Sequence, residues 1–191
     1  MVKIISVANQ KGGVGKTTTS INLATSLSAI NKKTLLIDAD PQGNASTGIG
    51  ISYEKRSPNL YDLIVNGFLD LNAIKKTIVP GLDIITANTN LAASEIELAE
   101  VKNREFVISN LLSKIEGYDY ILIDCPPALG LLTINALVAS NSIIIPLQAE
   151  FFALEGISSL VNSVELIREG FNPNLIIEGI LLTMVDKRNS L

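Results

Sequence analysis

The chain has 191 residues, a formal net charge of −4, 47% hydrophobic residues and only 5% aromatic residues. This length suits one domain with a sizeable core, and the negative charge argues against a protein that is basic over its whole surface. With no histidine and a single cysteine, Cys125, the sequence excludes an internal disulfide, a multi-cysteine metal site and histidine-based catalysis within one chain.

Six apolar runs rich in β-branched residues predict strands. They are residues 3–8, 34–38, 82–87, 120–125, 142–147 and 177–185. Most of them lack the alternation of a half-exposed strand, so we expect them to be covered on both faces. Helix-like segments separate them, at 16–30, 58–66, 91–115, 130–140 and 152–169. This order predicts an α/β fold with a doubly wound, mainly parallel sheet flanked by helices.

Residues 1–191 are expected to form a single domain. The polar stretch 52–59, "SYEKRSPN", predicts a surface loop. The N-terminus has an apolar run too short for a signal peptide or a membrane span, so we expect a cytoplasmic protein. At the other end only "DKRNSL" follows the last predicted strand. We therefore expect a domain truncated at its C-terminus, with its last strand exposed.

A glycine-rich stretch, "NQKGGVGKTTTS" at 9–20, joins the first predicted strand to the first predicted helix. Its glycines and the helix N-terminus direct several backbone N–H groups at one point, which suits a polyphosphate. Lys16 is expected to reach the β- and γ-phosphates of a nucleoside triphosphate, and the Thr17 hydroxyl to bind Mg²⁺. The strict pattern G-x-x-x-x-G-K-[ST] is not met, because Gln10 replaces its first glycine.

A dinucleotide fingerprint, G-x-G-x-x-G, is the main alternative for this loop. Gly13 and Gly15 have its spacing, and Asp38 ends the second predicted strand, where a ribose-binding acid would lie. However, Thr18 replaces the third glycine, and this fingerprint does not require Lys-Thr at 16–17. Binding of a nucleoside triphosphate is favoured over this alternative and over a purely structural turn.

Aspartates follow two more predicted strands, in "DADPQGN" (38–44) and "DCPPALG" (124–130). Loops after parallel strands gather at one edge of the sheet, so these acids are expected to converge on the glycine-rich loop. Asp124 suits Mg²⁺ or its bound waters, and Asp40 suits a general base or water-orienting residue. The candidate metal ligands are therefore Thr17, Asp40 and Asp124. The alternative is that such strand-terminal aspartates only cap the following turns.

Three stretches, "KGGVGKTT", "LLIDADPQGNAS" and "YILIDCPPALGLLTINAL", together resemble the ParA/Soj family of deviant Walker-A ATPases, which partition bacterial chromosomes and plasmids. The resemblance continues through "IPLQAEFFALEG" (145–156) and "IEGILLTMVD" (177–186). It implies the P-loop NTPase fold, the cofactors ATP and Mg²⁺, and slow, partner-stimulated hydrolysis of ATP to ADP and phosphate.

The resemblance also implies roles for individual residues. Lys11 matches the family's signature lysine, which reaches the partner's nucleotide in an ATP sandwich dimer. Asp40 matches the acid that positions the attacking water, and Asp124 matches the Walker-B aspartate. Arg188 falls where chromosomal members carry a DNA-binding arginine. The implied catalytic residues are Lys11, Lys16, Asp40 and Asp124, and the implied nucleotide-binding residues are Lys11, Gly12, Gly13, Val14, Gly15, Lys16, Thr17, Thr18, Met184 and Asp186.

The expected partners follow from the same resemblance. They are a second copy of the chain when ATP is bound, nonspecific DNA and a ParB-type centromere-binding protein, with the protein associated with the nucleoid and no membrane contact. The alternative is a membrane-cycling regulator of the division site like MinD, which shares these loops. An amide-forming synthetase lacks a recognisable substrate site here, and a reductase like the nitrogenase iron protein needs two cysteines per chain.

Overall fold

The computed structural model describes residues 2–148 and 153–185, apart from the side chains of residues 153–155. Its strands form one seven-stranded sheet. They are β1 (Lys3–Val7), β2 (Thr34–Asp38), β3 (Ile74–Lys76), β4 (Leu82–Ile85), β5 (Tyr120–Asp124), β6 (Ser142–Gln148) and β7 (Ile176–Thr183). The order across the sheet is β3-β4-β2-β5-β1-β6-β7, and only the β3–β4 pair is antiparallel.

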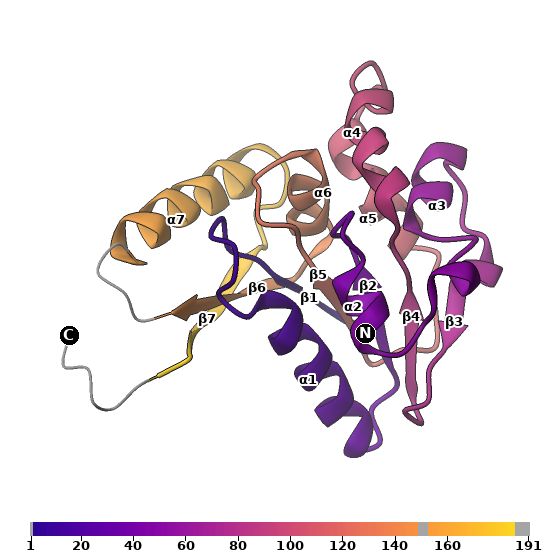
Figure 1. Ribbon diagram of the computed structural model, residues 1–191. Coiled ribbons are helices and arrows are strands. Elements are labelled where there is room, and N and C mark those ends of the chain that lie inside the picture. The colour runs from indigo at the N-terminus through magenta and orange to yellow at the C-terminus, as the bar shows by residue number, and fades with distance from the viewer. Residues whose placement is uncertain (1, 149–152, 186–191) are drawn as a thin grey trace.

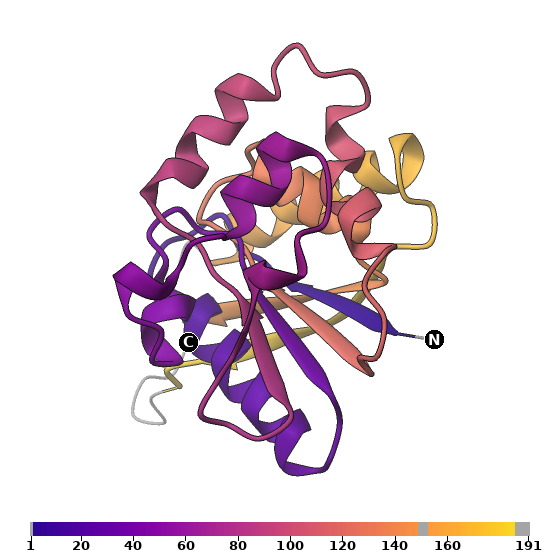
Figure 2. The same ribbon diagram turned by 90° about the vertical axis from the view of Figure 1, so that its right-hand side faces the viewer.

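Helices cover the two faces of this sheet unequally (Figures 1 and 2). They are α1 (Lys16–Ala29), α2 (Asn44–Gly48), α3 (Leu60–Asn66), α4 (Ser94–Glu97), α5 (Val107–Leu112), α6 (Leu131–Ala139) and α7 (Ala153–Gly170). One apolar cluster joins α1 and α2 to the sheet, and a larger one joins α3, α5, α6 and α7 to its other face. The predicted doubly wound, mainly parallel α/β sheet is confirmed.

The central strands explain why the sequence shows little alternation. Leu35, Leu36 and Ile37 of β2 are each completely buried. Leu35 and Ile37 belong to the larger apolar cluster, whereas Leu36 belongs to the cluster beneath α1. Both faces of the strand are therefore apolar, and each such side chain contributes roughly 1.5–3 kcal/mol through burial.

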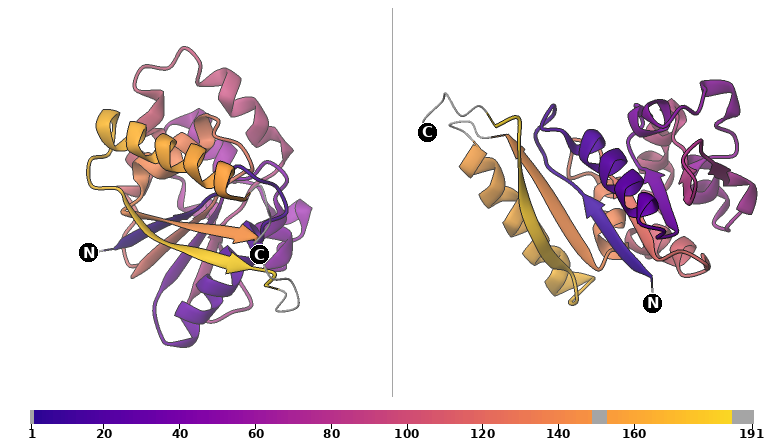
Figure 3. Two further views of the ribbon diagram at one scale, coloured as in Figure 1. Left: turned by 90° about the vertical axis from the view of Figure 1, so that its left-hand side faces the viewer. Right: turned by 90° about the horizontal axis from the view of Figure 1, so that it is seen from below.

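Strand β7 differs from the central strands because it lies at the edge of the sheet, beside β6 (Figure 3). Its side chains are exposed at nearly every position, including Ile176, Ile180 and Leu182. The expectation that the predicted strands are covered on both faces is wrong for this one. The expectation of an exposed last strand agrees with the structure.

Four parts of the described structure differ from the sequence expectations. The predicted helix over 91–115 is interrupted: α4 covers only four residues, and Asn103 adopts a left-handed conformation (φ 58°) before the chain enters α5. The short elements α2 and β3 were not expected. In addition, the predicted surface loop 52–59 contains a short 3-10 helix, Tyr53–Lys55, and a buried arginine, Arg56.

No helix within residues 2–148 and 153–185 is both long enough and apolar enough to cross a membrane.

Candidate nucleotide-binding site

The loops that follow β1, β2 and β5 meet at the carboxyl edge of the sheet. In the register of these parallel strands, Asp124 is paired with both Val7 and Asp38. The backbone continues this pairing beyond the strands, because Ala39 N donates to Asp124 O and Cys125 N donates to Val7 O. The sheet therefore places the two predicted acidic segments beside the glycine-rich loop, as the sequence predicted.

At two positions, the backbone of the glycine-rich loop has a conformation that only glycine adopts readily. Gly13 (φ 75°) and Gly15 (φ 88°) are left-handed, and Gly15 is the N-cap residue of α1. Asn9 holds the beginning of the loop, because its Nδ2 donates to Pro146 O (2.7 Å) and its Oδ1 accepts from Lys11 N (3.0 Å). The loop thus has a fixed backbone that opens directly onto a helix N-terminus.

Lys16 lies inside the loop, whereas the Lys11 side chain is exposed. The Lys16 ammonium donates to the Lys11 carbonyl (2.9 Å), so the loop closes on itself through this bond. Burial lowers the pKa of Lys16, and the negative charges of Asp124 and Asp40 oppose that shift. A polyphosphate would supply Lys16 with charged acceptors that are stronger than a carbonyl oxygen.

Asp124 is completely buried at the end of β5. Its Oδ1 accepts a hydrogen bond from Ser20 Oγ of α1 (2.8 Å), whereas no residue that the structure describes donates a hydrogen bond of good geometry to its Oδ2. Burial, with a further contribution from the negative charge of Asp38, raises the pKa of Asp124 to about 7. A buried carboxylate oxygen without a donor is suited to a cation or to a water molecule bound to a cation.

Asp38 and Asp40 have different surroundings although they are only two residues apart. Asp38 is completely buried, and its Oδ2 accepts from both the N–H (2.8 Å) and the hydroxyl (2.7 Å) of Ser46 in α2. Burial raises the pKa of Asp38 to about 6. Asp40 accepts from Gln42 N (2.9 Å), and its carbonyl accepts from Gly43 N. Asp38 therefore anchors α2, while Asp40 faces the site.

A cavity of about 360 Å³ lies between these loops. It is lined by Gly12, Gly13, Gly15, Lys16, Thr17, Thr18, Asp40, Gln42, Asn44 and Pro127. Most of the predicted nucleotide-binding residues therefore surround one open space, together with the predicted water-positioning acid. The Val14 side chain is buried away from it, so only the Val14 backbone can contribute to binding.

Sequence reasoning missed the contact that Thr183 makes with this loop. At the end of β7, its hydroxyl donates to Val14 O (2.8 Å), and its methyl group lies close to Gly15. The apolar run around Thr183 predicts a strand end, and nothing in it indicates a contact with a loop about 170 residues earlier. Met184 follows with a left-handed backbone (φ 51°) and an exposed side chain, outside the lining of the cavity.

The two remaining predicted site residues, Asp186 and Arg188, lie outside the described residues.

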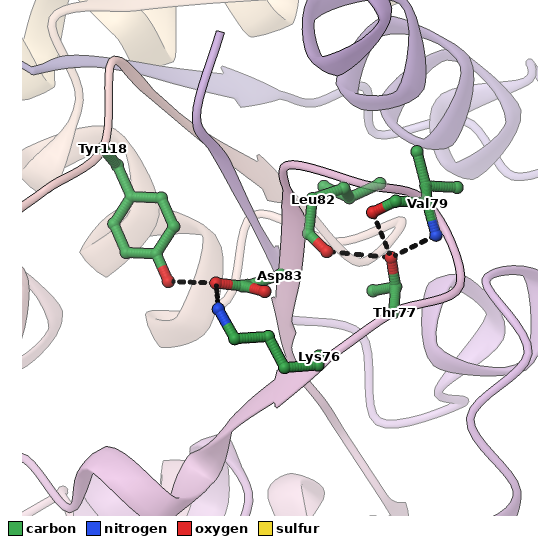
Figure 4. A network of polar contacts seen from close by, with 6 residues as sticks. All are labelled: Lys76, Thr77, Val79, Leu82, Asp83 and Tyr118. Atoms are coloured by element: carbon green, nitrogen blue, oxygen red, sulfur yellow. Dashed lines mark hydrogen bonds and ion pairs between the residues drawn. The ribbon is translucent and has the colours of Figure 1, made fainter. Parts of the chain in front are cut away.

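A second polar cluster lies at the opposite, amino end of β4, around a cavity of about 430 Å³ (Figure 4). The Asp83 carboxylate there accepts from both Tyr118 Oη and Lys76 Nζ, each at 2.7 Å. Burial and the bond to Asp83 raise the pKa of Tyr118. These groups form hydrogen bonds to one another, and neither of the left-handed glycines that line the cavity, Gly81 and Gly117, is followed by a helix. The residues predicted to bind nucleotide lie at the other end of the sheet.

The chain matches one family model and is similar to several known proteins. A family model described as an AAA domain matches residues 2–177. The chain is 49% identical to the chromosome partitioning protein ParA of Caulobacter vibrioides, and it covers 72% of that protein. It is 52% identical to the sporulation initiation inhibitor protein Soj of Bacillus subtilis and covers 76% of it. The alignment spans 100% of this chain in both cases.

Solved structures with the same fold include one described as a cobyrinic acid a,c-diamide synthase of Mycobacterium smegmatis with bound ADP and magnesium. It is 34% identical, with a TM-score of 0.94, over 99% of this chain and 77% of that one. A putative plasmid partition protein of Borrelia burgdorferi bound to AMPPNP is 33% identical, with a TM-score of 0.82, over 99% of this chain and 77% of that one. On the match to the family model and the identity to ParA and Soj, the chain belongs to the ParA/Soj family of partitioning ATPases.

Proposed function

We propose that the protein is an ATP-dependent switch for the segregation of DNA. In this proposal, two ATP-bound copies form a sandwich dimer that binds nonspecific DNA. A ParB-type partner stimulates hydrolysis of ATP to ADP and phosphate, and the ADP form releases the DNA. The observation that carries the proposal is the cavity in which the glycine-rich loop, Lys16 and Asp40 come together beside the buried Asp124.

The residues of the site suit ATP with Mg²⁺. The phosphates would replace Lys11 O as the acceptor for Lys16, and the backbone N–H groups of residues 12–17 would surround them. Thr17 and Asp124 would hold Mg²⁺ directly or through its waters, and the Asp124 Oδ2, to which none of the described residues donates a hydrogen bond, would gain a partner there. Bound Mg²⁺ would neutralise charge that develops on the phosphate oxygens.

Asp40 is the proposed acid that positions the attacking water. It lines the cavity with its carboxylate held by Gln42 N, so it faces the space that a terminal phosphate would occupy. Since the chain has no histidine, a carboxylate at this place is the natural group to orient a water molecule. Lys16 and the loop amides would stabilise the charge of the transition state.

Lys11 is the proposed link between nucleotide and dimer. It precedes the glycines, and its side chain is exposed at the mouth of the loop. Two ATP molecules that face one another across an interface repel, and a lysine delivered from each partner would relieve that repulsion. Dimer formation would then depend on the γ-phosphate, as a switch requires.

The assignment to partitioning rests on the relatives at 49% and 52% identity, which are named ParA and Soj. The synthase from Mycobacterium smegmatis shares less sequence, at 34% identity. A membrane-cycling role like that of MinD is the alternative, and DNA binding is the property that separates the two. Arg188 is the residue proposed to contribute to DNA binding.

Sedimentation with DNA tests the switch directly. The protein should sediment with DNA in the presence of ATP and Mg²⁺, and it should remain in the supernatant with ADP. Lys16→Ala should stay in the supernatant with either nucleotide, because it cannot hold the phosphates. Retention on DNA that does not depend on the nucleotide would refute the switch, and binding to anionic vesicles without binding to DNA would favour the alternative.

A second experiment separates Lys11 from Lys16. With ATP, Lys11→Ala should elute as a monomer in size-exclusion chromatography while still binding nucleotide with near-normal affinity. Lys16→Ala should lose both properties. Normal ATP-dependent dimerisation of Lys11→Ala would remove Lys11 from the proposed mechanism.

A further inference from the structure

Arg56 is a buried cation with an unusual set of partners. Only 6% of the residue is exposed, although the surrounding stretch is polar. Among the residues that the structure describes, no carboxylate forms an ion pair with it. Its guanidinium instead donates to neutral oxygens: Ile51 O from Nε and Nη2 (3.3 Å each), Ala87 O from Nη1 (3.2 Å) and Thr47 Oγ1 from Nη2 (2.7 Å). A buried charge held in this way points to a specific structural task.

The acceptors of Arg56 come from two separate parts of the chain. Thr47 belongs to α2, and Ile51 follows that helix, whereas Ala87 follows the end of β4. The backbone of Arg56 is fixed as well, because its carbonyl accepts from Thr86 Oγ1 (3.0 Å). One side chain therefore joins the α2 segment to the end of β4.

This junction is in direct contact with the loop that carries Asp40. Gly43 is left-handed (φ 64°), and a Cβ atom there would collide with Arg56 Nη1 and with Ala87 O. Gly43 N donates to Asp40 O (2.9 Å), and Gly43 O accepts from Thr47 Oγ1 (3.2 Å), the hydroxyl that also accepts from Arg56. The guanidinium thus packs against the backbone three residues after Asp40.

A second chain of bonds fixes the other side of the same loop. Ala87 N donates to Ser46 Oγ (3.0 Å), and Ser46 donates to the Asp38 carboxylate (2.7 Å). Asp40 therefore lies between two anchored positions, Asp38 and Gly43. Both anchors connect to Ala87, and Arg56 holds the Gly43 side.

We propose that Arg56 is a positioning residue for ATP hydrolysis. It fixes Gly43 and α2 against the end of β4 and thereby holds the Asp40 carboxylate toward the nucleotide cavity. This inference rests on the role proposed above for Asp40. Arg56 makes none of its hydrogen bonds to residues 9–20, so it contributes to the rate of hydrolysis and not to the binding of nucleotide.

The geometry requires a guanidinium. Its planar fork supplies donors in several directions at once, which lets it serve Ile51, Ala87 and Thr47 together. A lysine ammonium at the same place is a single nitrogen on a flexible chain and cannot span these acceptors. Arg56→Lys should therefore retain the charge but behave much like Arg56→Ala.

A cavity of about 490 Å³ opens onto Arg56 and is lined also by Pro41, Gln42 and Tyr53. It gives small cations a route to the space that the missing side chain would leave in Arg56→Ala. Added methylguanidinium can then occupy the position of the fork and restore part of the tether. Such rescue would not follow if Arg56 only contributed to overall stability through its aliphatic chain.

The experiment measures steady-state ATP hydrolysis with Mg²⁺ for the wild type, Arg56→Ala, Arg56→Lys and Asp40→Ala. Each rate is divided by the concentration of nucleotide-binding sites, which is determined by titration with a fluorescent ATP analogue. Both Arg56 variants should lose about tenfold or more in kcat with KM for ATP within about twofold, since small displacements of a catalytic group have effects of this size. Methylguanidinium should restore at least part of the kcat of Arg56→Ala and none of that of Asp40→Ala.

Arg104→Ala is the matched control. Arg104 also donates to a carbonyl, Ala99 O (2.7 Å), but lies before α5, far along the chain from the Asp40 loop. It should keep the wild-type kcat. An unchanged kcat per site in Arg56→Ala would overturn the proposal, and so would a loss that methylguanidinium does not reverse. Hydrolysis by Asp40→Ala at the wild-type rate would instead refute the role of Asp40, whereas an inactive Asp40→Ala beside a normal Arg56→Ala would refute only the role of Arg56.

Discussion

Asp124→Asn should make the nucleotide-free protein relatively more stable as the pH rises, while it abolishes ATP hydrolysis. The wild-type carboxyl is completely buried, and none of the residues placed by the structure donates a hydrogen bond to its Oδ2. Ionisation there is disfavoured, so the pKa rises from 3.8 to about 7. The asparagine has nearly the same shape and can still accept from Ser20 Oγ, but it never carries the charge.

The linkage between proton binding and folding gives the sign and the size of this change in stability. Because the folded state binds this proton more tightly than the unfolded state, the free energy of unfolding of the wild type falls as the pH rises from about 4 to about 7. A pKa raised from 3.8 to about 7 lowers the free energy of unfolding of the wild type by ~4 kcal/mol at pH 8, and ~2 kcal/mol of this loss is already present at pH 5. Relative to wild type, the variant should therefore gain ~2–3 kcal/mol between these two pH values.

Urea unfolding of both proteins at pH 5 and pH 8, without nucleotide or magnesium, measures this gain. Comparing the two pH values cancels any constant effect of placing a buried amide at this site. Asp83→Asn is the matched control, since it removes a strand carboxylate that is paired with Lys76 and Tyr118, and it should lower stability. If wild type gained stability over Asp124→Asn between pH 5 and pH 8, the account of the Asp124 environment would be wrong.

Three further predictions concern the same edge of the sheet. Gly43→Ala should lower the free energy of unfolding by more than ~2 kcal/mol in urea titrations, because it adds both left-handed strain and a collision with Ala87 O. Gly67→Ala, at a similar φ with open space around it, should lose only ~1 kcal/mol; equal losses would contradict the collision. Thr183→Val should lose ~1 kcal/mol and weaken ATP binding in fluorescence titrations, since it removes the bond to Val14 O, whereas Thr183→Ser should not. Calorimetry should show that Mg²⁺–ATP binds to the protein more tightly at pH 8 than at pH 6 and that binding releases protons, because Asp124 must ionise to hold the metal. An affinity that fell between pH 6 and pH 8 would exclude Asp124 from the metal site.

The sheet could be predicted because its central strands are apolar on both faces. Six of the seven strands were expected close to their observed positions, since runs such as "TLLID" have no polar face. The seventh, β3, has the sequence "IKK" and pairs antiparallel at the edge, and its two half-buried residues and one exposed residue give too little apolar signal to predict a strand. Helix α2, "NASTG", has only five residues, too few to show helical periodicity.

The candidate site residues could be predicted where they share one loop or follow strands whose ends must meet. Contacts that depend on where a distant element packs could not be predicted. Lys16, Thr17 and Gly15 share one loop, and Asp40 and Asp124 follow strands whose ends must meet. The contact between Thr183 and Val14 depends on the position of β7 relative to β1, which no local pattern determines.

The burial of Arg56 could not be predicted for another reason. Its stretch, "SYEKRSPN", has the composition of a solvated loop, and only the three-dimensional structure places the guanidinium beneath Gly43. A single arginine within a polar segment gives no sign of whether it is exposed or buried. The arginine side chain is long enough to be exposed or buried, and it is buried here because oxygen acceptors from other parts of the fold bind its guanidinium.

In the glycine-rich loop, the carbonyl of Lys11 would compete with nucleotide phosphates for the Lys16 ammonium. One lysine is held by the main chain of the other, so nucleotide phosphates must displace part of the protein itself in order to bind. Once they do, the carbonyl of Lys11 loses that donor, and the hydrogen bond from Lys11 N to Asn9 remains as a tether. Filling a subunit's own site would then change a hydrogen bond of Lys11, the residue proposed to serve the neighbouring subunit.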